Sequence, residues 1–353
     1  MKIAIIGAGN GGQAMAGHFA SMGHDITLYN RSLAKIAPIA ETKEIRLSDK
    51  INGSARVNRV TDDLKEAVAE AELVMITTTA DAHKEIAAKM AEHLADNQVI
   101  VLNPGRTFGA LEFSTEVKKV ATKRLFIAES QSLIYACRAE SPGNVRIIGI
   151  KDSVYLAAYP SSDTDYVLDI VNGIFPCFVK AENILHTGLE NIGAMFHPTV
   201  IIFNAAAIER GNLFYFYNDM TPATAEFLDN IDNERLDIGN AFGIDLLSLS
   251  DWVSYAYKNI KGATLREKML NNPAYYKILA PNTLYSRLML EDVPTGIVPL
   301  IELAKLAGVE TPLMCSILNI SQSLLRINFG RSGRTLKSLG LKGLPVKELK
   351  RRM

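Results

Sequence analysis

The most restrictive feature of this sequence is the glycine-rich segment Gly7-Ala8-Gly9-Asn10-Gly11-Gly12 near its start. The segment directly follows the apolar run 2–6 and opens a helical pattern over 13–22. In such a unit the first glycine permits a tight turn, the second lets the backbone approach a pyrophosphate, and the last lets helix and strand pack closely. A turn without a ligand is the alternative, which the position directly after the first strand disfavours. We therefore predict that Gly7, Gly9, Asn10, Gly11 and Gly12 bind a dinucleotide.

The periodicity of apolar residues changes near residue 185. Before this point, short strand-like runs alternate with helical patterns, as in βαβ units with a parallel sheet. These runs lie at 2–6, 25–29, 73–77, 99–102, 125–128 and 145–150. Long helical patterns follow, at 198–210, 223–242, 248–258 and 298–307. The sequence predicts an α/β Rossmann dinucleotide-binding domain over 1–185, followed by an all-α domain over 186–353.

Composition indicates an ordinary globular protein. Lys plus Arg and Asp plus Glu both count 38 and 48% of residues are hydrophobic, so the overall charge favours no nucleic-acid partner. The cysteines Cys137, Cys177 and Cys315 lack the spacing of a disulfide framework or a metal site. No apolar stretch approaches the ~18 residues of a membrane span, and no signal peptide precedes the first strand. We expect a cytoplasmic protein with small-molecule substrates, without metal, nucleic-acid or membrane partners; a homo-oligomer stays open.

The residues after the second predicted strand bear on the choice of cofactor. The chain reads Asn30-Arg31-Ser32 there, where a fold that binds NAD usually places an acid for the ribose 2′-hydroxyl. An arginine and a serine can instead hold a 2′-phosphate. We predict that Asn30, Arg31 and Ser32 favour NADP over NAD. The alternative is that Arg31 is a solvated residue at a helix start.

Two further loops follow predicted strands at their carboxyl ends. They are Thr77-Thr78-Thr79 and Asn103-Pro104-Gly105. Open α/β sheets present their ligands to such loops. We expect Thr78, Asn103 and Gly105 to border the nicotinamide, with ordinary turn and capping chemistry as the open alternative.

A histidine stands at the start of the second half. His197 precedes Pro198 and a strongly helical run. Proline disfavours helical geometry in the residue before it and suits the first helical position, so we expect His197 at a helix start or kink. Position alone favours a structural histidine over a catalytic one.

Six short motifs, taken in order, resemble those of the octopine/nopaline (opine) dehydrogenase family. They are the glycine-rich segment, Asn103-Pro104-Gly105-Arg106, Glu129-Ser130, His197-Pro198, an Arg-x-x-x-x-Asp-Val-Pro motif from Arg287 to Pro294, and Gly333-Arg334-Thr335-Leu336. Each motif is weak alone, whereas six in order are specific. The resemblance implies an NAD(P)-dependent enzyme that condenses a 2-oxo acid, pyruvate or 2-oxoglutarate, with the amine of an amino acid. The imine is reduced by hydride, and the reverse oxidation is implied as well.

The resemblance also implies roles for individual residues. His197 would be the acid/base and Asp292 would orient its imidazole. Arg287 would hold the carboxylate of the 2-oxo acid with its planar fork. The residues implied on the substrate side are Glu129, Ser130, Asn191 and Asn204. Members of the family often carry an acid after the second strand, and Asn30-Arg31-Ser32 departs from that pattern.

Two other functions compete with this interpretation. A reductase of the ketopantoate or glycerol-3-phosphate dehydrogenase type would need a catalytic lysine in the helical half. Lys258, Lys261 and Lys268 lie among polar residues without an obvious motif. A non-catalytic NADP-binding sensor is the second alternative, because a fold alone does not prove catalysis. The joint presence of His197, Arg287 and Asp292 argues against the sensor.

Overall fold

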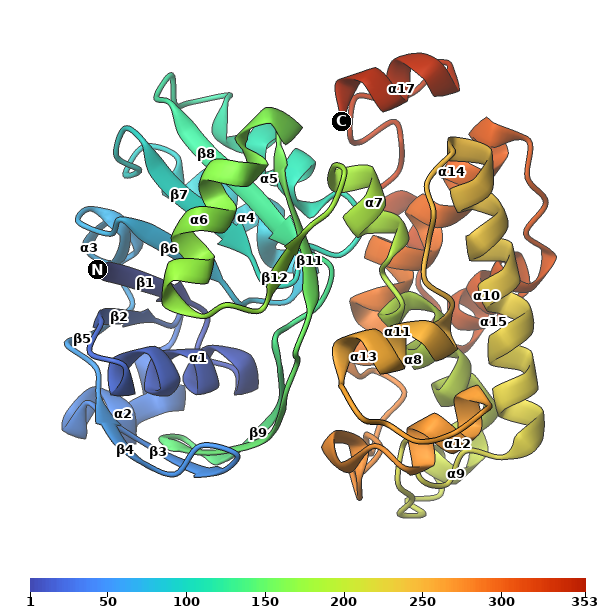
Figure 1. The fold of residues 1–353 in the computed structure, drawn as a ribbon, viewed down its shortest axis with the longest axis horizontal. Helices are drawn as coiled ribbons and strands as arrows, with labels where there is room; N and C mark the ends of the chain where they lie inside the picture. The colour runs from blue at the N-terminus through green and yellow to red at the C-terminus, as the bar shows by residue number, and fades with distance from the viewer. The chain divides into compact units, whose positions relative to one another are not determined.

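The computed structural model describes residues 1–353, which form two compact units. One unit comprises Met1–Gly105 and Gly109–Ile184, and the other comprises Arg106–Phe108 and Leu185–Met353. Figure 1 shows strands and helices mixed in the first unit and helices alone in the second. The units separate beside the predicted boundary at 185/186, but no sequence pattern indicated that Arg106–Phe108 joins the helical unit.

The first unit is built on an eight-stranded sheet in the order β12-β11-β8-β7-β6-β1-β2-β5. All neighbouring strands are parallel except β11 with β8. Strand β6 is apolar and buried along its whole length, as expected where helices cover both faces of a parallel sheet. The strands are β1 (Lys2–Ile6), β2 (Asp25–Tyr29), β5 (Arg59–Thr61), β6 (Leu73–Ile76), β7 (Gln98–Leu102), β8 (Leu125–Ser130), β11 (Val154–Tyr159) and β12 (Phe178–Lys180). The helices between them are α1 (Asn10–Ser21), α2 (Ala37–Thr42), α3 (Leu64–Val68), α4 (His83–Met90), α5 (Gly109–Val117) and α6 (Thr164–Ile174).

A second sheet of four strands, in the order β4-β3-β10-β9, also belongs to the first unit. The strands are β3 (Glu44–Asp49), β4 (Gly53–Arg56), β9 (Tyr135–Ser141) and β10 (Asn144–Ile150). The prediction that 145–150 extends the parallel sheet is therefore wrong. Gly143, at a φ of 85°, turns the chain back so that β10 pairs antiparallel with β9.

Helix α1 contacts strands of both sheets. A Cβ at Gly17 would lie 2.8 Å from the side chain of Ile45 and 2.9 Å from that of Leu47. The missing side chain thus lets α1 pack closely against β3. This packing holds in place the helix whose first turn lies within the glycine-rich segment.

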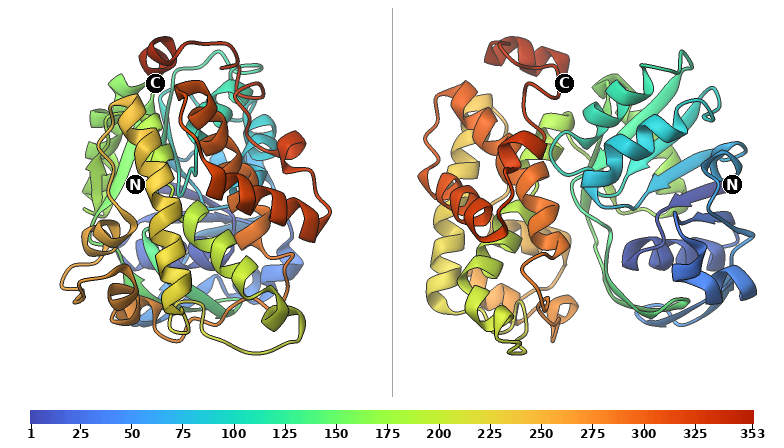
Figure 2. Two further views of the ribbon diagram at one scale, coloured as in Figure 1. Left: turned by 90° about the vertical axis from the view of Figure 1, so that its right-hand side faces the viewer. Right: turned by 180° about the vertical axis from the view of Figure 1, so that it is seen from behind.

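The second unit consists of helices and turns. The longest helix, α10 (Pro222–Phe242), contacts α8 (Gly193–Phe203), α14 (Val298–Ala307) and α15 (Pro312–Leu325), and Figure 2 shows it in two views. The remaining helices are α7 (Ile184–Leu189), α9 (Ala205–Glu209), α11 (Leu249–Ala256), α12 (Leu265–Leu270), α13 (Arg287–Leu290), α16 (Phe329–Ser332) and α17 (Val346–Arg352). A π-helical turn, η5 (Val293–Ile297), links α13 to α14. No helix has the combination of length and apolar character that crossing a bilayer requires.

Of the two positions expected for His197, a helix start or a kink, the helix start is wrong. Helix α8 begins at Gly193, so His197 lies inside the helix and Pro198 is not its first residue. Proline has no N–H to donate to the carbonyl of Ala194, which weakens a helix locally. Nearly every residue of α8 is buried, and this packing outweighs the local preference. The helix predicted over 198–210 is also divided, because Asn204 separates α8 from α9.

Candidate active site

The glycine-rich segment has a shape that fits a pyrophosphate. Gly7 has a φ of +108°, and a Cβ at Gly12 would lie 1.7 Å from the carbonyl oxygen of Gly7, so the turn depends on both glycines. A Cβ at Gly9 would meet no atom within 4 Å. Gly9 is the N-cap of α1, and neither a capping side chain nor an acid occupies the first turn. The backbone N–H groups at the start of α1 therefore suit a bound anion.

The two remaining residues of the segment fix it to its surroundings. The side-chain oxygen of Asn10 accepts a hydrogen bond from the N–H of Ala139, at 2.9 Å. A Cβ at Gly11 would lie 2.9 Å from the side chain of Leu133. Asn10 and Gly11 thus hold the turn against neighbouring parts of the first unit.

Asn30 joins the end of β2 to the glycine-rich segment. Its side-chain oxygen accepts a hydrogen bond from the N–H of Ala8 at 3.3 Å, and its side-chain nitrogen donates to the carbonyl of Ser32 at 2.8 Å. Arg31, between them in the chain, is exposed and forms no ion pair. The guanidinium of Arg31 is therefore available to a ligand that lies along the segment.

Buried polar atoms without partners lie where β6 and β7 end. The hydroxyl of Thr78 has no hydrogen-bond partner, and neither has either amide atom of Asn103, which is only 1% exposed. Such orphaned atoms are rare inside a folded protein and need a ligand or water. Gly105 follows, and a Cβ there would lie 2.4 Å from the Cβ of Glu129. The carboxyl ends of these strands therefore fit the polar ring of a bound nicotinamide.

Glu129 and Ser130 end strand β8 and are both fully buried. Oε2 of Glu129 accepts a hydrogen bond from the N–H of Ala110 at 2.7 Å, in the first turn of α5, where a carboxylate is stabilised by the helix. The hydroxyl of Ser130 donates to the carbonyl of Ser132 at 3.0 Å. The structure thus gives both residues partners within the protein, and a substrate contact by either stays a prediction.

The helical unit contains a chain of five side chains in which basic and acidic groups alternate. Nδ1 of His197 lies 2.7 Å from Oδ2 of Asp292. Arg106 follows, with Nη1 3.2 Å from Oδ1 of Asp292 and Nε 3.2 Å from Oε1 of Glu291. Nη1 of Arg287 completes the chain, 3.2 Å from Oε2 of Glu291. We call these five residues the charge chain.

Solvent reaches only the two ends of the charge chain. The side chain of Arg287 is 53% exposed and that of His197 is 16% exposed, whereas Asp292 is fully buried. Burial disfavours the charge on Arg106, but the negative charges of Asp292 and Glu291 outweigh that effect and raise its pKa. Arg106 therefore keeps its positive charge inside the unit, and the outer residues of the chain can meet a ligand.

Asn191 and Asn204 lie in different settings. Asn191 is fully buried, and its side-chain nitrogen donates to the hydroxyl of Thr107 at 3.3 Å. Its side-chain oxygen has no partner. The side chain of Asn204 donates to the carbonyl of Val200 at 2.9 Å and so ends α8. The structure brings Asn191 next to the loop that carries Arg106, whereas Asn204 makes no hydrogen bond to the charge chain.

Sequence reasoning gave no role to Arg106 or Glu291. Both lie within motifs that carry the family resemblance, directly after Gly105 and directly before Asp292. Their position next to these motif residues is the only feature of the sequence that points to a role for Arg106 and Glu291. Nothing in the local pattern indicated that two residues 185 positions apart form an ion pair.

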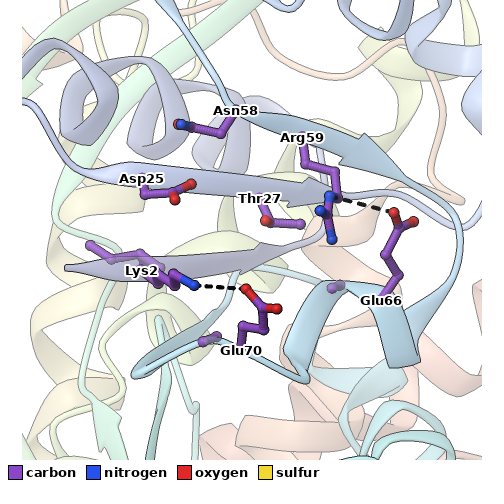
Figure 3. Close-up of a pocket in the computed structure, with 10 residues that line it drawn as sticks. Lys2, Asp25, Thr27, Asn58, Arg59, Glu66 and Glu70 are labelled. Atoms are coloured by element: carbon purple, nitrogen blue, oxygen red, sulfur yellow. Dashed lines mark hydrogen bonds and ion pairs between the residues drawn. The ribbon is translucent and has the colours of Figure 1, made fainter.

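The first unit also has a hollow at another place, shown in Figure 3, which is a weaker candidate for a ligand site. Four of its charged residues pair with one another, Lys2 with Glu70 at 2.7 Å and Arg59 with Glu66 at 3.4 Å. Lys2 begins β1, so the hollow lies at the opposite end of that strand from Gly7. Ligands of parallel sheets bind at the carboxyl ends of the strands.

Two family models match different parts of the chain. Residues 180–325 match the NAD/NADP octopine/nopaline dehydrogenase, alpha-helical domain. Residues 2–120 match the NAD-dependent glycerol-3-phosphate dehydrogenase N-terminus. These matches confirm the predicted α/β Rossmann domain followed by an all-α domain. Among curated relatives, the opine dehydrogenase of Arthrobacter sp. (strain 1C) is 35% identical over 343 residues, which cover 97% of this chain and 95% of that protein.

Solved structures share the fold over nearly the whole chain. Octopine dehydrogenase in complex with NADH and agmatine has a TM-score of 0.81 at 20% identity, and the match covers 99% of this chain and 97% of that one. Yersinopine dehydrogenase with NADP⁺ bound has a TM-score of 0.70 at 16% identity, with 99% and 97% covered. Identities this low describe the fold rather than the reaction.

Proposed function

Because this chain belongs to the octopine/nopaline (opine) dehydrogenase family, we propose that it joins a 2-oxo acid to the amine of an amino acid with NADPH as reductant. As its motifs predicted, it is an NAD(P)-dependent oxidoreductase that acts on CH–NH donors. In the proposed reaction the keto oxygen leaves as water and a C=N bond forms. Hydride then adds to the carbon and a proton to the nitrogen, which gives a secondary amine. The reverse oxidation follows the same steps backwards.

The contact between His197 and Asp292 carries this proposal. With Nδ1 held 2.7 Å from the carboxylate, Nε2 is the ring nitrogen that remains to exchange a proton. An acid is needed where the keto oxygen leaves as water, and a proton must move when the amine attacks. A partly exposed imidazole backed by a buried carboxylate suits both steps.

Arg287 is proposed to bind the carboxylate of the 2-oxo acid, pyruvate or 2-oxoglutarate. Only one of its nitrogens is engaged by Glu291, and about half of the side chain is exposed. A guanidinium in this state can offer a second pair of N–H donors to a carboxylate. Glu129, Ser130, Asn191 and Asn204 stay proposed for the amino-acid side, where a basic or a small amino acid is the expected partner.

The cofactor, when bound, supplies the hydride. We propose that the glycine-rich segment holds its pyrophosphate, and that Thr78, Asn103 and Gly105 border its nicotinamide. The exposed guanidinium of Arg31 supports NADPH, because a 2′-phosphate would give that group a partner. No acid stands at Asn30-Arg31-Ser32 to hold the 2′-hydroxyl of NADH.

The reductases of the ketopantoate and glycerol-3-phosphate dehydrogenase type are the weaker candidates. The glycerol-3-phosphate dehydrogenase model matches only residues 2–120. The helical domain matches the octopine/nopaline dehydrogenase model instead. The basic residues of the charge chain are two arginines and a histidine, with no lysine among them.

An assay that varies the amine tests the proposal. NADPH oxidation is followed with pyruvate or 2-oxoglutarate, with and without each amino acid. The proposed function predicts a rate that requires an amino acid and a product with a secondary amine, identified by mass spectrometry. An equal rate without amine would identify a simple 2-oxo reductase. No turnover across the whole panel, together with normal NADPH binding, would identify a sensor.

A further inference from the structure

We propose that Arg106 is a positioning residue that holds Asp292 and Glu291 in one line and sets the pH range over which His197 exchanges its proton. The inference rests on the proposed function of the His197–Asp292 pair. It goes beyond that function by giving a role to a residue from the N-terminal half of the chain.

The first support is the way in which Arg106 bridges two carboxylates. Nε donates a hydrogen bond to Glu291 at 3.2 Å and Nη1 forms an ion pair with Asp292 at 3.2 Å, so one planar group faces both acids. Its side chain is only 8% exposed. A lysine offers a single nitrogen at the end of a flexible stem and could not span both carboxylates with the same geometry.

The second support is the backbone that delivers Arg106. Arg106 and Phe108 have φ values of 62° and 63°, in the left-handed region that residues other than glycine rarely adopt. Such conformations are costly and cluster at functional sites, where surrounding contacts impose them.

Those surrounding contacts converge on Thr107. Its N–H donates to the carbonyl of Thr295 at 3.2 Å, and its hydroxyl donates to the carbonyl of Gly188 at 2.8 Å. Arg334 donates to its carbonyl at 3.2 Å. Every polar group of Thr107 is therefore bonded within the helical unit, which holds Arg106 in place.

The third support is the close approach of α8. A Cβ at Gly193 would lie 2.7 Å from Nη1 of Arg106 and 3.2 Å from Oδ1 of Asp292. A residue larger than glycine would displace the guanidinium, because the helix backbone approaches it directly. The space beside the backbone of α8 at Gly193 is thus occupied by the guanidinium of Arg106.

The direction in which Arg106 acts on the protonation of His197 follows from the order of the charged groups. The carboxylate of Asp292 favours a protonated His197, whereas the positive charge of Arg106 beside the same carboxylate opposes it. Without that charge His197 would keep its proton to higher pH. The other ionisable groups that face Arg106 or its partners are Glu291, Arg287 and Tyr217.

Two substitutions separate the charge of Arg106 from its shape. Arg106→Gln removes the charge, and we expect the midpoint of the His197 titration to rise by about one pH unit. Arg106→Lys keeps the charge, so the midpoint should stay near that of the wild type, while kcat falls about tenfold or more because the two carboxylates lose their common partner. Arg210→Gln, at an exposed arginine directly after α9, is the control and should change neither the midpoint nor kcat.

The titration is measured in two ways. The imidazole signal of His197, assigned by its loss in His197→Gln, is followed by NMR against pH in the full chain without substrates. The pH–rate profile of NADPH oxidation is recorded in parallel. The NMR measurement needs no turnover, so an inactive wild type would refute the proposed function without deciding the role of Arg106.

If Arg106→Gln fails to fold, the double variant Arg106→Gln/Glu291→Gln removes one charge of each sign from the interior. The His197 midpoint should also rise, by less than in the single variant, because Arg106 pairs directly with Asp292, whereas Glu291 pairs with Arg106. A midpoint that does not move in a folded Arg106→Gln protein, or in the double variant, overturns the proposal and leaves Arg106 with a structural role alone.

Discussion

Nδ1 of His197 lies 2.7 Å from Oδ2 of Asp292, although 95 positions separate the two residues in the chain. The carboxylate is fully buried and the imidazole is partly exposed, so the pair has an inner and an outer end. Asp292 also fixes the orientation of the ring, because one of its oxygens is engaged by Arg106 and cannot rotate away freely. A proton that reaches a substrate through this pair would pass through Nε2.

Removal of the imidazole should therefore affect turnover and leave cofactor binding intact. We expect His197→Ala to lower kcat by about 10²- to 10⁴-fold, the usual contribution of a positioned acid/base. NADPH affinity, measured by fluorescence titration, should stay within about twofold of the wild type. His93→Ala, in the first unit, serves as the matched control and should retain full turnover. Near-normal turnover of His197→Ala would return this residue to a structural role.

Arg287 allows a test of carboxylate binding. Arg287→Lys keeps a positive charge near Glu291 but loses the planar fork, so we expect the KM for the 2-oxo acid to rise about tenfold or more. The affinity for NADPH should not change. Steady-state kinetics at saturating amine give the first value and a binding titration gives the second. A change in cofactor affinity with an unchanged KM would contradict the assignment.

Cofactor choice depends on the exposed guanidinium after β2. Arg31→Ala should weaken NADPH by about 10- to 100-fold, the value of one lost charge-assisted contact, and leave NADH nearly unaffected. Lys35→Ala removes an equally exposed charge from the neighbouring η1 turn (Leu33–Ile36) and should affect both cofactors little. Equal weakening of the two cofactors by Arg31→Ala would refute a contact with the 2′-phosphate.

A buried carboxylate in the helical unit should make stability depend on pH. Burial raises the pKa of Glu190 to about 7, although Arg235 at 3.7 Å opposes this shift. Below its ordinary pKa near 4.5, Glu190 is protonated in both the folded and the unfolded state and does not make the free energy of unfolding depend on pH. As the pH rises from there to about 7, the unfolded state loses its proton first, so the free energy of unfolding falls by about 1 to 3 kcal/mol.

Glu190→Gln should remove this fall in the free energy of unfolding with rising pH. Urea denaturation can be followed by the fluorescence of the single tryptophan, Trp252, which is buried in α11 of the same unit as Glu190. The variant should be more stable than the wild type above pH 7 and should differ less from it near pH 5. Parallel curves of stability against pH for the two proteins would show that Glu190 titrates normally.

The sequence predicted the elements that short-range patterns determine. The glycine-rich segment placed β1 and α1 correctly, because a tight turn, a strand and a helix start all leave their mark within about twenty residues. The helix predicted over 298–307 coincides with α14, whose end is fixed by Gly308 in the left-handed conformation. The order of the six motifs indicated the family, which the relatives confirm.

The elements that were missed depend on contacts between distant residues. Strand β10 belongs to the second sheet because it pairs with β3, which lies about a hundred positions earlier in the chain. His197 was expected at a helix start or a kink. The helix start is wrong, because the burial of most of α8 outweighs the preference of the residue before a proline. The role of Arg106 is not apparent from the sequence, since only the folded chain brings it to Glu291 and Asp292.

The assignment of Arg106–Phe108 to the helical unit has a consequence for modular engineering of these enzymes. A chimera that joins the first 185 residues of one relative to the helical half of another would take its arginine from one parent and both carboxylates from the other. Truncation at the same boundary would leave Glu291 and Asp292 buried without their shared cation. The point at which these genes can be recombined is therefore not the point at which the polypeptide changes from sheet to helix. A workable exchange must carry the three-residue loop together with the C-terminal half, as a graft into the N-terminal parent.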